Sequence, residues 1–230
     1  MADLDLARRF VEATHRLSGP GDMSAKLHEA VALAAGAVPG CDYAGMTVLD
    51  RRTELRTPAY TTESALEADS TQYRLAEGPC LETARNGVSW LQIDDVESDH
   101  RWPRFAHRAR LLGIRSVFSC ALVSPRGRLG ALNLYAERPR AFGSADREIA
   151  LLFATHAGVL LSTSRMEDSL RTAIDSREHI GIAMGILMER HKVTMARAFE
   201  MLSRVSQDTN TKVRELAARV IETGEDPAPD

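Results

Sequence analysis

The sequence has 230 residues and a formal net charge of −3, with 44% hydrophobic and 27% charged residues. This composition is typical of a soluble globular protein with one large or two modest domains. The slight acidity excludes binding of nucleic acid through bulk positive charge, so any such site must be a local cluster of Lys and Arg. No apolar run approaches the roughly 20 residues that span a bilayer, and the first residues lack a secretory pattern. We therefore expect a cytoplasmic protein with no membrane partner.

Hydrophobic periodicity predicts a mixture of short helices and strands over the first two thirds of the chain. Helices are predicted over 4–17, 24–38, 62–73, 80–86 and 102–112, and strands over 43–49, 55–60, 88–93, 116–123 and 129–135. The last two strands are separated by Ser124-Pro125-Arg126-Gly127-Arg128, a hairpin signal that predicts antiparallel pairing. The pattern indicates an α+β domain, an antiparallel sheet flanked by helices.

A long helix is predicted from Ser144, because proline and strand signals then disappear. Apolar or small residues recur at alternating steps of three and four, at Ile149, Leu152, His156, Val159, Thr163, Met166, Leu170 and Ala173. We call this series the heptad seam. Such a seam favours a parallel homodimer through the helix over 144–176. The alternative is a single helix packed on the sheet of the first domain.

Three amphipathic helical patterns predict an all-α three-helix bundle at the C-terminus. The first covers about 175–190, the second starts after an N-cap at Thr194, and the third starts near 210 or 211 and closes at Gly224. Phe199 is expected in the core of this bundle. Gly181 and Gly185 lie inside the first helix, where each weakens the helix by about 1 kcal/mol relative to Ala. A compensating contact is expected, and we predict that another helix approaches closely at these two positions.

The predicted domains are therefore an α+β domain over 1–160 with a helical extension at 1–20, a connecting helix over 161–174, and a bundle over 175–224. Residues 225–230 are expected to form a disordered tail.

The C-terminal stretch resembles an ANTAR domain. The resemblance rests on S-R-E-H-I-G-I-A-M-G-I-L-M over 176–188, A-F-E-M-L over 198–202, Ser206, Asn210, and E-L-A over 215–217. It implies a three-helix module that binds RNA hairpins in transcription antitermination, typically as a dimer. Met184 departs from the family pattern, in which many members carry Lys, and so removes one candidate phosphate contact.

Residues 22–160 resemble a GAF domain. The resemblance rests on A-E-G-P-C-L-E-T over 76–83, D-H-R-W-P-R-F over 99–105, G-I-R-S over 113–116, G-A-L-N-L-Y over 130–135, and A-F at 141–142. It implies an antiparallel sheet with helices on its faces and a pocket that serves as a ligand, redox or dimerisation module.

The candidate RNA-contacting residues are the basic residues of the C-terminal helices, Arg177, Arg190, Lys192, Arg197, Arg204, Lys212 and Arg214. Each could instead belong to a solvated helix face. Cations at 190–192 would also complement the dipole of the helix that they end.

The candidate ligand pocket is formed by Tyr43, Cys80, Trp90, Trp102, Phe105 and Phe118, although these side chains could simply be core. Cys80 near a helix start would have a lowered thiol pKa, whereas burial would leave it inert. We predict no metal site, because the three cysteines form no C-x-x-C pair and no ligand pattern surrounds His100 or His107. No cofactor and no catalytic residue can be named from the sequence.

These features predict a signal-responsive, RNA-binding antitermination regulator that is not an enzyme. A DNA-binding regulator and a protein-interaction regulator with a degenerate RNA site are the alternatives. A thiol-dependent reductase is a third, weaker one.

Overall fold

The computed structural model describes residues 22–50, 54–86, 88–125 and 127–227. The helix predicted over 4–17 lies outside the described residues. In chain order the elements are α2 (Met23–Ala37), β1 (Tyr43–Leu49), β2 (Leu55–Tyr60), α3 (Glu63–Leu75), α4 (Pro79–Arg85), β3 (Trp90–Ile93), α5 (Pro103–Leu111), β4 (Ser116–Ser124), β5 (Gly127–Ala136), α6 (Ser144–His191), α7 (Met195–Thr209) and α8 (Val213–Thr223). They form two compact units that divide between Ser164 and Arg165.

The first unit is built on a five-stranded sheet with the order β2-β1-β5-β4-β3, and every neighbouring pair is antiparallel. The hairpin predicted between β4 and β5 is confirmed, and each predicted strand lies within two residues of its observed bounds. The predicted fold class, an antiparallel sheet flanked by helices and followed by a long helix and a helical bundle, is confirmed.

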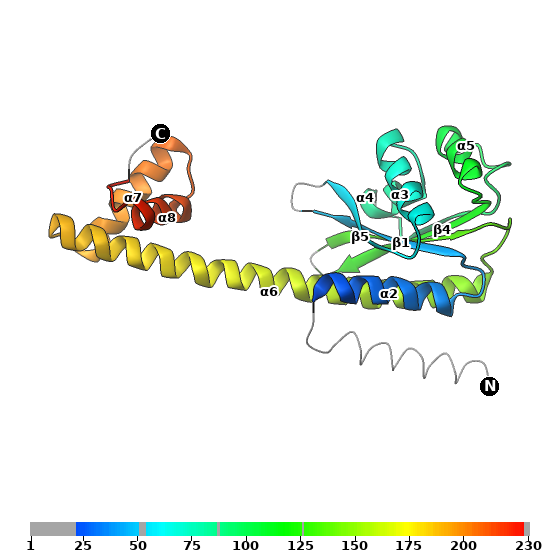
Figure 1. The fold of residues 1–230 in the computed structure, drawn as a ribbon, viewed down its shortest axis with the longest axis horizontal. Helices are drawn as coiled ribbons and strands as arrows, with labels where there is room; N and C mark the ends of the chain where they lie inside the picture. Colours follow the sequence, from blue (N-terminus) through cyan, green and yellow to red (C-terminus); the bar gives the residue numbers. More distant parts are fainter. Residues whose placement is uncertain (1–21, 51–53, 87, 126, 228–230) are drawn as a thin grey trace. The chain divides into compact units, whose positions relative to one another are not determined.

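Strand alternation gives the two faces of the sheet different chemistry. Helix α2 and the first part of α6 cover one face, and α3, α4 and α5 cover the other (Figure 1). The α2/α6 face is apolar and includes Met46, Phe118 and Leu134. The opposite face carries Thr47, Ser119 and Asn133, which are polar and fully buried. The sheet therefore presents a buried polar layer to α3 and α4.

Helix α6 packs on the sheet through one face of its first part, which contributes Ala150, Phe153, Ala154, Ala157 and Leu161 to the core. Gly158 allows this close approach, because a Cβ atom there would lie 2.5 Å from the carbonyl oxygen of Val123. The packing confirms that this segment is a core helix of the first unit.

Helix α6 also meets the length and composition of a membrane span, which the sequence analysis did not anticipate. Its most apolar window of 18 residues has a mean hydropathy of 1.3, and 33% of that window is buried. This is weak evidence for a span, because the core helix of a soluble protein has the same composition.

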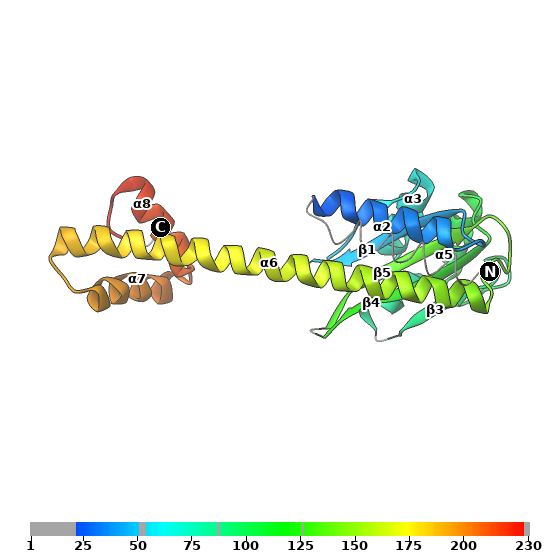
Figure 2. The ribbon, with the colours of Figure 1, turned by 90° about the horizontal axis from the view of Figure 1, so that it is seen from below.

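The second unit comprises the continuation of α6 with α7 and α8, as seen in Figure 2. Its core is formed by Ala183, Leu187, Ala198, Leu202, Leu216, Ala217 and Val220. Thr194 caps α7 as predicted, since its hydroxyl accepts a hydrogen bond from the Arg197 amide. The third helix begins at Val213 rather than near 210, because Asn210 adopts the left-handed conformation that ends α7. Gly224, with φ of 70°, closes α8.

Candidate nucleic-acid interface and buried polar layer

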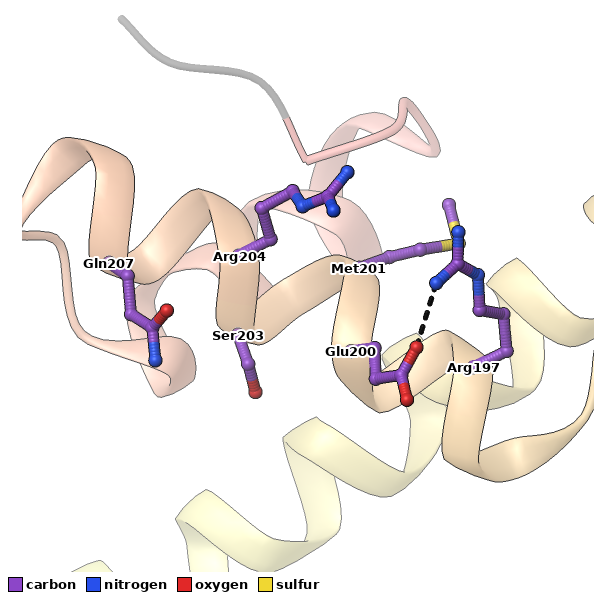
Figure 3. Close-up of a pocket in the computed structure, with 6 residues that line it drawn as sticks. All are labelled: Arg197, Glu200, Met201, Ser203, Arg204 and Gln207. Carbon is purple, nitrogen blue, oxygen red and sulfur yellow. Dashed lines mark hydrogen bonds and ion pairs between the residues drawn. The ribbon is translucent and has the colours of Figure 1, made fainter.

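The exposed side of α7 carries two of the candidate RNA-contacting residues. Arg197 and Arg204 line one hollow of about 350 Å³, which is completed by Glu200, Met201, Ser203 and Gln207. Figure 3 shows these side chains along α7, with the Arg197 guanidinium directed toward the Glu200 carboxylate. Residues seven apart share a helix face, so the hollow follows from the helical period.

The other five candidates lie outside this hollow. Arg190 lies in the last turn of α6 and Lys192 directly follows that helix. Lys212 and Arg214 lie at the start of α8, and Arg177 lies on α6. All seven side chains are exposed. The structure thus gathers Arg197 with Arg204, and Arg190 with Lys192, rather than all seven in one place.

Several of these cations pair with neighbouring carboxylates. Arg197 lies 2.7 Å from Glu200, Arg190 lies 2.9 Å from Asp226, and Lys192 contacts Glu189. All three pairs are exposed, and exposed ion pairs contribute only about 0–1 kcal/mol each. A phosphate group could therefore replace any of these three carboxylates at small cost in free energy.

The sequence analysis expected Phe199 in the core. The structure contradicts this, because 46% of the Phe199 surface is exposed. Its neighbour Ala198 and the residue one turn later, Leu202, face the core instead. The second unit therefore exposes one aromatic side chain on the helix that carries Arg197.

Met184 is half-buried and packs against the core of the second unit. An apolar residue fits this position because packing against the core removes the apolar surface of its side chain from water. Close to it, Gly181 and Gly185 have no atom within 4 Å of the position of an added Cβ. The close helix approach predicted for these glycines is therefore not found among the described residues.

The six residues predicted to line a ligand pocket lie on both faces of the sheet. Phe118 and Trp90 contact each other on the α6 side, with ring centroids 5.8 Å apart. Phe105 is buried on the opposite side, where Tyr43 and Trp102 pack against the same cluster. The sequence could not assign these faces, and no single cavity gathers the six.

Cys80, the sixth pocket candidate, belongs to the buried polar layer. It is fully buried, and the Thr47 hydroxyl donates to its Sγ at 3.6 Å. Its backbone amide donates to Gln72 Oε1 at 2.9 Å. Burial raises the pKa of the Cys80 thiol well above its usual range. The lowered pKa considered for this thiol is therefore wrong, because burial outweighs the nearby helix N-terminus.

Asp69 lies at the centre of this layer and was not singled out from the sequence. Its carboxylate accepts hydrogen bonds from Asn133 Nδ2 and Thr57 Oγ1, each at 2.9 Å, and from the Tyr135 hydroxyl. Gly45 leaves room for it, because an added Cβ would lie 2.6 Å from Asp69 Oδ2. Burial raises the pKa of Asp69 to about 6, and these hydrogen bonds oppose the increase.

Further hydrogen bonds make the layer continuous across the sheet. Thr47 Oγ1 lies 2.7 Å from the Tyr73 hydroxyl and accepts from Asn133 Nδ2 at 2.8 Å. Ser119 donates to Asn133 Oδ1 at 2.7 Å and lies 2.7 Å from the Thr83 hydroxyl. The layer links β1, β4 and β5 to α3 and α4, which is how it holds a carboxylate away from water.

The remaining cysteines are also poor nucleophiles. Burial raises the pKa of Cys41 to about 12 and raises that of Cys120 further. None of the three is in a disulfide. Within the described ranges, no group of three or more His, Cys, Asp or Glu side chains could hold a metal ion.

Several solved structures are similar in fold to this chain. Solved structures similar to the chain include the GAF domain of a phosphoenolpyruvate-protein phosphotransferase from Acinetobacter, which is 14% identical, covers 70% of this chain and 94% of its own, and has a TM-score of 0.56. Free methionine-R-sulfoxide reductase from Neisseria meningitidis, in complex with its substrate, is 17% identical over 70% of this chain and 91% of its own, with a TM-score of 0.55. The Stigmatella aurantiaca phytochrome photosensory core module is 12% identical, covers 88% of this chain and 44% of its own, and has a TM-score of 0.59. At these identities the likeness shows the fold alone.

Two family models match the chain, whereas no curated protein matches it. The GAF domain model matches residues 23–162, and the ANTAR domain model matches residues 168–221. The first match spans more than half of the chain and coincides with the sheet-containing unit. The chain therefore belongs to the GAF domain family and carries an ANTAR domain after it, the architecture of a signal-sensing antitermination regulator.

Proposed function

We propose that this chain is a signal-responsive regulator whose ANTAR domain binds RNA hairpins in leader transcripts and so acts in transcription antitermination. The observation that carries the proposal is the hollow on α7, where Arg197 and Arg204 are exposed on one helix face within the ANTAR match. Guanidinium groups bind phosphate with paired hydrogen bonds and can stack on bases. As a regulator of transcripts, the protein would act in the cytoplasm.

The test is a fluorescence anisotropy titration with a labelled tandem-hairpin RNA and a DNA duplex of matched length. We expect Arg197→Ala/Arg204→Ala to weaken RNA binding about a hundredfold or more, since two lost charge-assisted contacts at about 1.5–3 kcal/mol each remove at least about 3 kcal/mol. The slope of log K against log salt should fall by about two. The matched control is Arg108→Ala/Arg110→Ala, which removes two exposed charges from α5 in the first unit.

Two outcomes would favour the alternatives. Equal affinity for the DNA duplex, with the same sensitivity to the two arginines, would favour a DNA-binding regulator. Absence of binding to either nucleic acid at micromolar protein would favour a protein-interaction regulator with a degenerate RNA site. An equal loss in the α5 control would mean that net charge, not the hollow, determines binding.

We further propose a homodimer formed through the helix over 144–176. Most of the heptad seam is on the outside of α6: Leu152, Val159, Met166 and Leu170 are at least half exposed. In the first unit, the residues that pack on the sheet, including Ala154 and Leu161, lie on the opposite side of the same helix. One face of α6 thus completes the domain core, and an apolar face is left for a second copy.

The signal is proposed to reach the GAF domain as a ligand or redox change, and the structure supports a ligand more than a thiol reaction. All three cysteines have raised pKa values, so little reactive thiolate exists at neutral pH. The same observation supports a regulator rather than a thiol-dependent reductase. The ligand would have to open the packed aromatic or polar residues of the first unit.

A further inference from the structure

The segment after α8 returns to the end of α6 and was expected to be disordered. Asp226 accepts a hydrogen bond from Arg190 Nη1 at 2.9 Å, and His191 Nε2 lies 2.9 Å from the same carboxylate. The second amino group of Arg190 donates to the Gly224 carbonyl. The Arg190 guanidinium and the His191 imidazole, both from α6, therefore converge on one carboxylate from the C-terminal segment.

This arrangement has the form of an anion site filled by an internal anion. Hydrogen bonds from His191 and then Arg190 hold the pKa of Asp226 below its usual range, so the carboxylate stays charged. A phosphodiester presents the same feature as a carboxylate, two oxygens on one centre that share a negative charge, and the guanidinium fork fits both. The pair is exposed, so water competes with it and it can exchange.

The location suits a phosphate as well. Carbonyl groups at the C-terminal end of a helix repel anions, and the Arg190 guanidinium reverses that local charge. Lys192 follows directly and contacts only the exposed Glu189 among the described residues. A phosphate bound here would therefore meet three consecutive basic or potentially basic side chains.

We propose that Arg190 and His191 form a single-phosphate site of the ANTAR domain, and that the Asp226 carboxylate occupies it until an RNA phosphodiester displaces it. The proposal rests on the RNA-binding function proposed above. The acidic tail is then an internal competitor that lowers the apparent affinity for RNA by the fraction of sites it fills. An RNA that presents no phosphate to this site gains no affinity from displacing the Asp226 carboxylate.

The test uses the full chain and the labelled tandem-hairpin RNA, with Asp226→Asn as the variant. We expect Asp226→Asn to bind RNA about two- to fivefold more tightly, the range set by losing one exposed ion pair. Glu225→Gln is the matched control, because it removes the same charge one residue away and, among the described residues, its carboxylate pairs with neither Arg190 nor His191. In an Arg190→Ala background, Asp226→Asn should change the affinity no more than Glu225→Gln does.

Equal effects of Asp226→Asn and Glu225→Gln would overturn the proposal, because net charge alone would explain them. Weaker RNA binding by Asp226→Asn, with an unchanged circular dichroism melting curve, would also overturn it.

A second readout does not depend on RNA. The His191 ring signals in NMR spectra, assigned through His191→Gln, are followed during a titration with inorganic phosphate. Phosphate should shift them at a lower concentration in Asp226→Asn than in the natural sequence. If no variant binds RNA but this difference is seen, the anion site stands and the RNA function fails; if RNA binds and the difference is absent, the site fails.

Discussion

Asp69 shows how one residue can couple the stability of the first unit to pH. Its carboxylate is fully buried and accepts three hydrogen bonds from neutral donors, with no cation among its partners. Neutral donors only partly replace the water lost on burial, so the pKa rises to about 6 from 3.8. The folded protein therefore binds this proton more tightly than the unfolded chain does.

The free energy of unfolding should accordingly fall as the pH rises from about 4 to about 6, by roughly 3 kcal/mol from this residue. Below pH 4 the stabilisation is fully present, and above pH 6 it is lost, because the folded pKa is the higher one. In Asp69→Asn the amide oxygen can still accept from Asn133 and Tyr135, the amide nitrogen can donate to Thr57 Oγ1, and the charge is gone, so the pH profile of this variant should lack the decline. Urea unfolding at several pH values, followed by tryptophan fluorescence, would measure the difference; parallel profiles would contradict the argument.

The cysteines give a second prediction at this scale. At pH 7.5 a thiol reagent should modify Cys80 and Cys120 very slowly in the folded protein and rapidly in denaturant, because both are buried and their pKa values are raised. Mass spectrometry after timed alkylation would locate the modified residues. Fast modification of Cys80 in the native state would restore a thiol-based sensing mechanism.

At the scale of elements, α6 has one apolar face that is buried and a second that is exposed. The buried face belongs to the first unit, while exposed apolar side chains, among them Met166, Leu170 and Ile174, continue beyond it. A helix that keeps such residues in water gains by burying them against another chain, at roughly 25 cal/mol per Å² of apolar surface. The heptad spacing is the basis of our proposal that this partner is a parallel helix of a second copy.

We therefore expect Val159→Glu/Leu170→Glu to be monomeric at micromolar concentration, where the natural sequence should be a dimer. The reason is repulsion between the new charges and the cost of desolvating them. Thr172→Glu adds a charge on the side of α6 away from Leu170 and should leave the dimer intact. Sedimentation velocity distinguishes the species, and a monomeric natural sequence would refute the seam as an interface.

For the whole molecule, each unit has its own set of buried apolar residues. Both tryptophans, Trp90 and Trp102, lie in the first unit, and the second unit is helical. We expect thermal unfolding to give two transitions, one seen by tryptophan fluorescence and both seen by far-ultraviolet circular dichroism. Coincident curves for the two signals would mean that the units unfold as one.

Local signals in the sequence predicted most of the fold. Strand alternation and the Thr194 cap depend on neighbouring residues, so the described strands and most described helices were found within a few positions. The exception is α6, which the sequence analysis divided into a connecting helix ending at 174 and a separate bundle helix over 175–190. Six of the eight heptad-seam residues are exposed, whereas Ile149 and His156 are half-buried. Helix α6 runs without a break to His191 because neither proline nor a cap interrupts it.

The buried polar layer could not be predicted, because its hydrogen bonds join residues far apart in the chain. Thr47 and Asn133 lie between apolar neighbours in β1 and β5, and this was the available signal for a buried polar site. Phe118 and Phe105 could not be assigned to opposite faces of the sheet from the sequence, because that assignment depends on the strand register and the helix packing. Phe199 was placed in the core because the helical pattern alone does not fix how wide the buried face is.

The central position of β5 has a consequence for the order in which the protein folds during synthesis. Strand β1 pairs with β2 soon after both emerge, but its other edge waits for β5, since Tyr43 pairs with Tyr135. Until then, an unpaired strand edge and the apolar side of β1 are open to other chains, which is the stage at which aggregation competes. The helices of the second unit contact elements that are close to them in the sequence, so this unit folds quickly once it has been synthesised. Slow translation just after β5 would therefore improve the yield of native protein, whereas a delay before it would prolong the vulnerable state.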